Sequence, residues 1–146
     1  MTIRIATIAD ITQLLNISMR TFSDSRAEMS PCEIESKRRE IRRYFEVYLR
    51  SPLSRTWVAE VNHEVVSLGT ITFFVRAARP SIPAAIEAYL ANIYTQPEYR
   101  RQGYATTILT AAKSYAQSQG INRIWLHTTE AGRPVYEAAG FQNAAA

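Results

Sequence analysis

The sequence has little of what disulfide-stabilised, cysteine-metal or membrane-spanning proteins require. Its 146 residues include one cysteine, Cys32, and two histidines, so an internal disulfide or a cysteine-based metal cluster is excluded. No stretch approaches the roughly 18 consecutive apolar residues of a membrane-spanning helix, and the opening MTIRIATIAD lacks the apolar core of a secretory signal. We therefore expect a cytoplasmic protein without a membrane partner.

Composition and charge describe an ordinary globular chain with a basic surface. The 47% hydrophobic and 21% charged content fits a single domain over residues 1–146 with one core. The net charge of +4 favours anionic ligands in general. The main basic cluster, SKRREIRR at 36–43, has the spacing of a solvent-facing helix and belongs to no nucleic-acid-binding motif, so we expect no nucleic-acid partner.

Hydrophobic periodicity predicts alternating helices and strands. In the first half it predicts a strand, two helices and a β-hairpin that turns at Asn62 and His63, over 2–6, 11–22, 33–50, 55–61 and 64–76. In the second half it predicts strand, helix, strand and helix over 86–95, 103–119, 122–128 and 132–139. The unit 86–128 is a parallel crossover, and the hairpin adds antiparallel neighbours. The pattern favours one mixed α/β sheet with helices on both faces.

The stretch RRQGYA at 100–105 lies between a predicted strand and a long predicted helix. The first turn of a helix has unpaired N–H groups and a partial positive charge, so it can bind a phosphate. Gly103 has no side chain, so a phosphate can approach its backbone closely, and the small Ala105 adds little bulk to the first helical turn. Arg100 and Arg101 add positive charge. Taken alone the pattern also fits a plain basic helix start, and it is not a Walker A loop because no Gly-Lys-Ser/Thr follows.

Two motifs in the correct order make the chain resemble a known family. The R-x-x-G-x-A of 100–105 is similar to the pyrophosphate signature of the GCN5-related N-acetyltransferases, and VYEAAGF at 135–141 is similar to a frequent ending of that family. The resemblance implies the acyl-CoA N-acyltransferase fold, a single, mostly antiparallel sheet with a central splayed parallel strand pair. It also implies an acyltransferase that uses acetyl-CoA as its acetyl donor.

The resemblance assigns cofactor-binding and acid residues. Backbone groups on the first parallel strand would bind the pantetheine arm, and the following turn would bind the pyrophosphate. Together these positions are Ile93, Tyr94, Thr95, Arg100, Arg101, Gln102, Gly103, Tyr104, Ala105 and Thr106. Tyr136 occupies the family's tyrosine position and is the candidate that protonates the leaving thiolate; the structural alternative is packing of a half-buried aromatic.

The base that deprotonates the amine stays open. Glu87 lies on the central strand, His127 ends the second parallel strand, and Glu130 follows in the next loop. Histidine exchanges protons readily near neutral pH. A chain of water molecules is a further alternative, and each of the three side chains also has a structural or solvated interpretation.

The sequence departs from the family at its end and leaves the acceptor open. No asparagine occurs in TTEAGRP (128–134), where Thr129 or Glu130 would have to replace it, and few residues follow Phe141. The last strand would be short, absent or supplied by a second subunit, which makes a homodimer one option. We expect the loops 23–31 and 77–85, with Phe22 and Tyr89, to border a small-molecule or peptide amine. The rival functions are a non-catalytic acyl-CoA-binding module and a basic nucleic-acid-binding or partner-binding domain.

Overall fold

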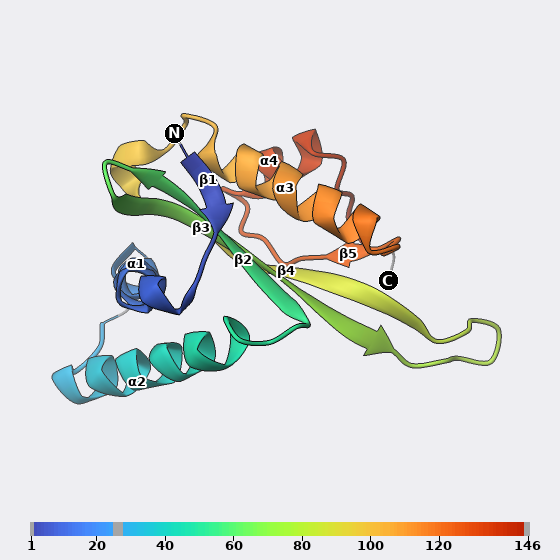
Figure 1. The fold of residues 1–146 in the computed structure, drawn as a ribbon, viewed down its shortest axis with the longest axis horizontal. Helices are drawn as coiled ribbons and strands as arrows, with labels where there is room; N and C mark the ends of the chain where they lie inside the picture. Colours follow the sequence, from blue (N-terminus) through green and yellow to red (C-terminus); the bar gives the residue numbers. More distant parts are fainter. Residues whose placement is uncertain (1, 25–27, 145–146) are drawn as a thin grey trace.

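The protein forms a five-stranded sheet in the computed structural model, which describes residues 2–24 and 28–144. The strand order is β1-β2-β3-β4-β5; the first three pairs are antiparallel and β4–β5 is parallel (Figure 1). The strands are β1 (Thr2–Ile5), β2 (Ser54–Val61), β3 (Glu64–Arg76), β4 (Ala85–Thr95) and β5 (Ile124–Trp125). The helices are α1 (Ile11–Asp24), α2 (Pro31–Tyr48), α3 (Tyr104–Ser118) and α4 (Arg133–Ala138), with short 3-10 turns η1 (Ile8–Asp10) and η2 (Pro97–Tyr99).

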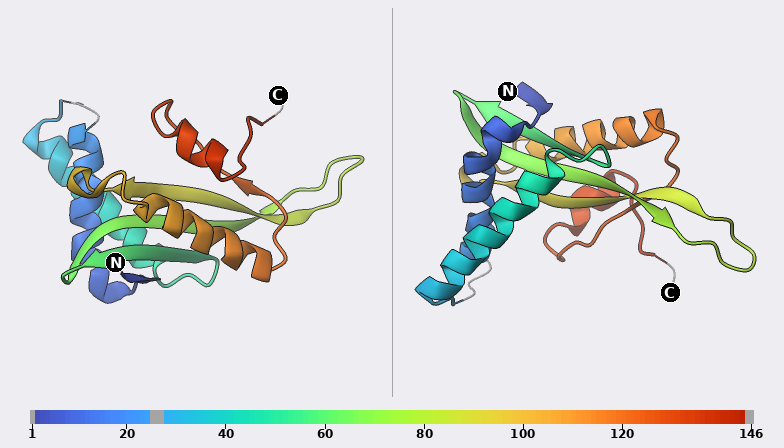
Figure 2. Two further views of the ribbon diagram at one scale, coloured as in Figure 1. Left: turned by 90° about the horizontal axis from the view of Figure 1, so that it is seen from above. Right: turned by 60° about the horizontal axis from the view of Figure 1, so that its bottom comes forward.

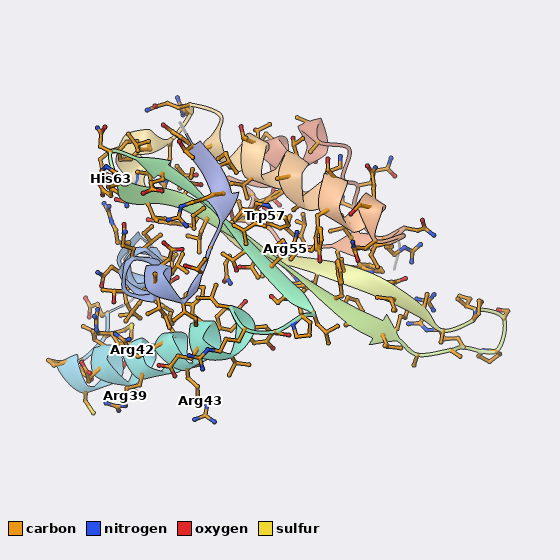
Figure 3. The ribbon with its side chains drawn as sticks, viewed as in Figure 1. Arg39, Arg42, Arg43, Arg55, Trp57 and His63 are labelled. Atoms are coloured by element: carbon orange, nitrogen blue, oxygen red, sulfur yellow. The ribbon has the colours of Figure 1, made fainter. Side chains whose placement is uncertain are left out.

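Helices cover both faces of the sheet, as predicted. Helices α1 and α2 pack on one face, and α3 and α4 on the other (Figures 1 and 2). On the α3 side, Trp57 of β2 makes an edge contact with Tyr115, whose ring also carries the Arg55 guanidinium at 3.8 Å. Arg55 and Trp57 both lie on β2 next to α3 in Figure 3. Two apolar cores, one on each face, therefore hold the sheet rigidly between the helices.

Local signals in the sequence explain most element boundaries. Ser30 caps α2 by accepting a hydrogen bond from the Glu33 N–H, and Pro31 occupies the first helical position, so this helix begins earlier than predicted. Asn62 and His63 both have positive φ, 49° and 65°, as the tight hairpin turn between β2 and β3 requires. The β3–β4 hairpin extends beyond the helices as an arm (Figure 1).

A β-bulge interrupts β4 in its second half. The pairing shifts between Leu68 opposite Tyr94 and Thr70 opposite Ala91, so two residues of β4 face Gly69 alone. Asn92 accommodates the bulge with φ of 60°. The bulge changes which β4 side chains face each side of the sheet. Leu90 and Ile93 are three residues apart and would face opposite sides of a regular strand, but both pack on the α3 side.

The second parallel strand is shorter than expected. The prediction of a strand over 122–128 is wrong at both ends: only Ile124 and Trp125 pair, with Ala88 and Tyr89 of β4. After Trp125 the chain leaves β4, while β4 itself continues to Thr95. The parallel pair is therefore splayed, as expected, and the divergence removes the ladder that would have lengthened β5.

Candidate functional site

A groove of about 590 Å³ opens where β4 and the chain after β5 diverge. Three segments line it: the end of β4, the turn that enters α3, and the start of α4 with the loop before it. Its lining residues are Ile93, Tyr94, Thr95, Tyr99, Arg100, Arg101, Gly103, Tyr104, Ala105, Thr106, Thr129, Ala131, Gly132, Val135 and Tyr136. Apart from Gln102, every position expected to bind the cofactor lies on this groove.

The turn into α3 has the conformation of an anion-binding loop. Gly103 is the N-cap of α3 with φ of 86°, and no side chain caps the helix. A Cβ added to Gly103 would meet no atom within 4 Å, so the approach to its backbone is open. Arg101 also has positive φ, 62°. An uncapped helix N-terminus of this kind can bind a phosphate through its backbone N–H groups.

The basic and polar side chains of this turn have different roles. The Nε of Arg100 donates a hydrogen bond to the Thr95 carbonyl at 2.9 Å, and its guanidinium lies 5.2 Å from the centre of the Tyr94 ring. Arg100 thus holds the end of β4 while it borders the groove. Arg101 is exposed, whereas the Gln102 side chain turns back toward the Glu98 carbonyl and does not line the groove.

The splay leaves one edge of β4 without a strand partner among residues 2–24 and 28–144. Only Ala88 and Tyr89 pair with β5, so the segment from Leu90 to Thr95 pairs with β3 alone. Backbone N–H and C=O groups on an edge that no strand covers can bind an extended ligand as a further strand would, although the Thr95 carbonyl already accepts a hydrogen bond from Arg100.

Tyr136 of α4 lies on the groove, as predicted. Its ring is half-buried and makes an edge contact with Phe141 at 6.1 Å between ring centres. Burial raises the pKa of the Tyr136 hydroxyl above its ordinary value of 10.0. The hydroxyl therefore stays protonated at neutral pH and is able to donate a proton.

The geometry does not support Glu87 as a base. Its buried carboxylate accepts hydrogen bonds from Arg76 Nε and Trp125 Nε1, each at 2.8 Å, and lies outside the groove. Burial is the largest single effect and raises the pKa of Glu87, but the two hydrogen bonds together with the charges of Arg76 and Arg123 outweigh it, so the pKa is lowered. Both carboxylate oxygens are used to join β3, β4 and β5.

His127 and Glu130 differ in their surroundings. The exposed His127 Nδ1 is hydrogen bonded to the Tyr89 hydroxyl at 2.7 Å, and His127 does not line the groove. Glu130 is exposed, forms an ion pair with Arg133 at 3.2 Å and does not line the groove. Thr129, the other candidate to replace the missing asparagine, does line it.

A second cavity of about 350 Å³ lies between α1, α2 and β4. Its lining residues are Ser18, Thr21, Phe22, Glu40, Ile41, Tyr44, Phe45, Leu68, Asn92, Ile93 and Tyr94. Phe22 lines this cavity, whereas neither Tyr89 nor loop 77–85, at the tip of the arm, does (Figure 1). Residues 25–27 of the other expected wall, and the Asp24 side chain, lie outside the described part of the chain.

The sequence reasoning missed three residues that shape the two cavities. Asn92 adopts the positive φ of the bulge between the two cavities, and Gly69, opposite the bulge, leaves space for the Ile93 side chain. The Tyr44 hydroxyl accepts a hydrogen bond from Asn92 Nδ2 at 2.9 Å. A signal existed for two of them, since a lone glycine or asparagine inside a strand pattern often marks a bulge.

The splayed sheet and the groove at the open turn are features that suit an acyltransferase with a phosphate-containing ligand. The model of the acetyltransferase (GNAT) family matches residues 12–141. A predicted acetyltransferase from Clostridium acetobutylicum, crystallised with acetyl-CoA, is 30% identical with a TM-score of 0.84, and the match covers 98% of this chain and 90% of that one. A GCN5-related N-acetyltransferase from Ralstonia eutropha, 20% identical, has the same fold: its TM-score is 0.82, with 98% and 93% covered.

A curated relative matches a shorter segment. The [ribosomal protein bS18]-alanine N-acetyltransferase of Haemophilus ducreyi is 34% identical over 58 residues, which are 38% of this chain and 40% of that protein's length. The chain belongs to the acetyltransferase (GNAT) family, whose members are acetyl-CoA-dependent N-acetyltransferases. The fold, enzyme class and acetyl donor expected from the sequence are thereby confirmed.

Proposed function

We propose that this protein transfers the acetyl group of acetyl-CoA to a primary amine by direct attack of the amine on the thioester. One observation carries the proposal: a single groove brings together the open turn at Gly103, the edge of β4 beyond its pairing with β5, and Tyr136. These are the three parts that must bind a pyrophosphate, bind a pantetheine arm and protonate a thiolate.

The cofactor would be bound mainly by backbone groups. The pyrophosphate would accept hydrogen bonds from the N–H groups of the turn over residues 101–106, with the exposed Arg101 adding positive charge. The pantetheine amides would pair with the β4 edge at Ile93, Tyr94 and Thr95. An N–H of the same edge would stabilise negative charge on the thioester oxygen as the tetrahedral intermediate forms.

The proton transfers need a base and an acid on different segments. An alkylamine is largely protonated at neutral pH, because its pKa is about 10, so it must lose a proton to attack. We assign His127 to this step: its Nδ1–H would donate to the Tyr89 oxygen, which leaves the Nε2 lone pair free to accept the proton through water, because His127 does not line the groove itself. The C–S bond then breaks, and Tyr136 protonates the CoA thiolate.

Two measurements test the proposal. Calorimetry with acetyl-CoA should show saturable binding, and release of free CoA thiol should require both acetyl-CoA and an added amine. Absence of acetyl-CoA binding at millimolar concentration would contradict the proposal. Binding without thiol release on a broad amine panel would instead indicate a non-catalytic acyl-CoA-binding module.

A further inference from the structure

The cavity between α1, α2 and β4 suggests the class of the acceptor. Resting on the proposed function, we infer that the preferred acceptor is a small primary amine with a compact apolar or aromatic body. It would lie in the cavity defined by Phe22, Tyr44 and Asn92 and present its amine at the β4 bulge.

The position of this cavity matches the geometry of acetyl transfer. Ile93 and Tyr94 line both the cavity and the cofactor groove, so the two spaces meet on either side of the same strand segment. The bulge at Asn92 is at this meeting point. An amine in the cavity would therefore reach a thioester lying along β4 without crossing the rest of the sheet.

The lining favours an apolar body. Phe22, Ile41, Phe45, Leu68 and Ile93 contribute apolar surface from both helices and both strands. The polar groups are few and are partly engaged with one another, as in the hydrogen bond from Asn92 to the Tyr44 hydroxyl. Burial raises the pKa of that hydroxyl, so it stays neutral. A volume of about 350 Å³ is at the small end of ligand pockets.

Charge disfavours two other classes of amine. Within the described part of the chain, Glu40 is the one acidic residue on the lining, and Lys37 pairs with it at 3.1 Å while lying 5.8 Å from the centre of the Phe22 ring. A polyamine or aminoglycoside would therefore have to compete with Lys37 for the Glu40 carboxylate. Among residues 2–24 and 28–144, no arginine or lysine lines the cavity, so these residues offer no cationic partner to the carboxylate of a free amino acid.

The basic face of α2 does not alter this conclusion. Arg39, Arg42 and Arg43 are exposed, as the sequence predicted, and lie on α2 in Figure 3. None of the three lines the cavity; Glu40, Ile41 and Tyr44 of the same helix do. The arginines add positive charge to the exposed surface of α2, which is unfavourable to the approach of polycationic acceptors.

The inference is tested by comparing probes under saturating acetyl-CoA. We expect kcat/KM for phenethylamine to exceed that for spermidine, kanamycin, glycine and a peptide with amino-terminal alanine by about tenfold or more. A higher kcat/KM for any of these four would overturn the inference and leave the proposed function intact. If acetyl-CoA itself failed to bind, the proposed function would fail instead.

Variants locate the acceptor. Phe22→Ala should raise the KM for phenethylamine about tenfold or more without changing the Kd for acetyl-CoA, and Phe22→Leu should recover much of the loss. Phe74→Ala, which removes an exposed ring on β3 outside the cavity, is the matched control. Equal KM values for wild type and Phe22→Ala, with Phe22→Ala still folded by circular dichroism, would contradict the assignment.

Discussion

Gly103 is the residue at which backbone conformation and ligand access coincide. Its φ of 86° disfavours any side chain, and the space beside it is open. Gly120, at the other end of α3, has φ of 74° and equally open surroundings but lies outside the groove, so it is a matched control. Gly103→Val and Gly120→Val should both lower stability by on the order of 1 kcal/mol. Only Gly103→Val should weaken acetyl-CoA binding in calorimetry, and equal affinities in the two variants would contradict the phosphate-binding turn.

Tyr136 tests the proposed acid. Tyr136→Phe keeps the ring and its contact with Phe141 but removes the hydroxyl, so we expect kcat to fall about 100-fold or more while the Kd for acetyl-CoA stays the same. Tyr48→Phe, a half-buried ring of α2 that lines neither cavity, is the control. An unchanged kcat in Tyr136→Phe would remove Tyr136 as the acid.

The placement of a single residue could be predicted from the sequence where a local motif specified it. It could not be predicted where a partner distant in the sequence determined it. Gly103 and Tyr136 belong to local motifs, and both lie on the groove. Glu87 was a reasonable base on paper, but Arg76 and Trp125 reach its carboxylate from neighbouring strands. Likewise the Tyr89–His127 hydrogen bond joins residues 38 apart in the sequence. Such pairings depend on strand order and register, which local patterns do not specify.

Among the elements, the bulged strand β4 shapes the site most directly. A Cβ at Gly69 would lie against Ile93 Cδ1 and 2.7 Å from Cγ2 of the buried Ile108. Gly69→Ala should therefore destabilise the fold by roughly 1–3 kcal/mol through overpacking and also weaken acetyl-CoA binding, because Ile93 lines the groove. Urea unfolding and calorimetry measure the two effects. Stability equal to that of the wild type would show that the bulge does not need a glycine opposite it.

The link between β1 and α1 predicts a dependence of stability on pH. The Arg4 guanidinium hydrogen-bonds to both Asp10 oxygens, and this pair lowers the pKa of Asp10 below its ordinary value of 3.8. A lowered pKa in the folded state stabilises the fold above 3.8, and this contribution is lost as the pH falls through the folded-state value. Asp10→Asn should thus be less stable than wild type at neutral pH, with the difference shrinking in acid. A difference in unfolding free energy that stays constant across this range would contradict the ion-pair account.

Helices with caps and amphipathic faces were predictable from the sequence, whereas the second parallel strand was not. Helix α3 begins and ends within one residue of its predicted bounds, because Gly103 and Gly120 flank a continuous apolar stripe. Strand β5 has only two residues because its neighbour β4 diverges from it, and that divergence is a tertiary effect.

The single-domain organisation and the cytoplasmic location stay predictions. No helix in the part of the chain that the structure describes is both long and apolar enough to span a membrane.

At the scale of the molecule, the sheet lies between two spaces that, in the proposed function, would hold the acetyl donor and the acceptor. The cofactor groove lies on the side of α3 and α4 and the smaller cavity on the side of α1 and α2, with Ile93 and Tyr94 common to both (Figures 1 and 2). The helices fix the two faces, and the bulge and splay of β4 open the sheet between them. This arrangement requires the thioester to lie along β4 next to the bulge.

A crystal structure with bound acetyl-CoA is the most direct test of this arrangement. We predict density for the pyrophosphate at the turn around Gly103, for the pantetheine arm along Ile93 to Thr95, and for the sulfur within reach of the Tyr136 hydroxyl. Acetyl-CoA bound elsewhere, for example at the open edge of β5 near Trp125 and Asn143, would contradict the account.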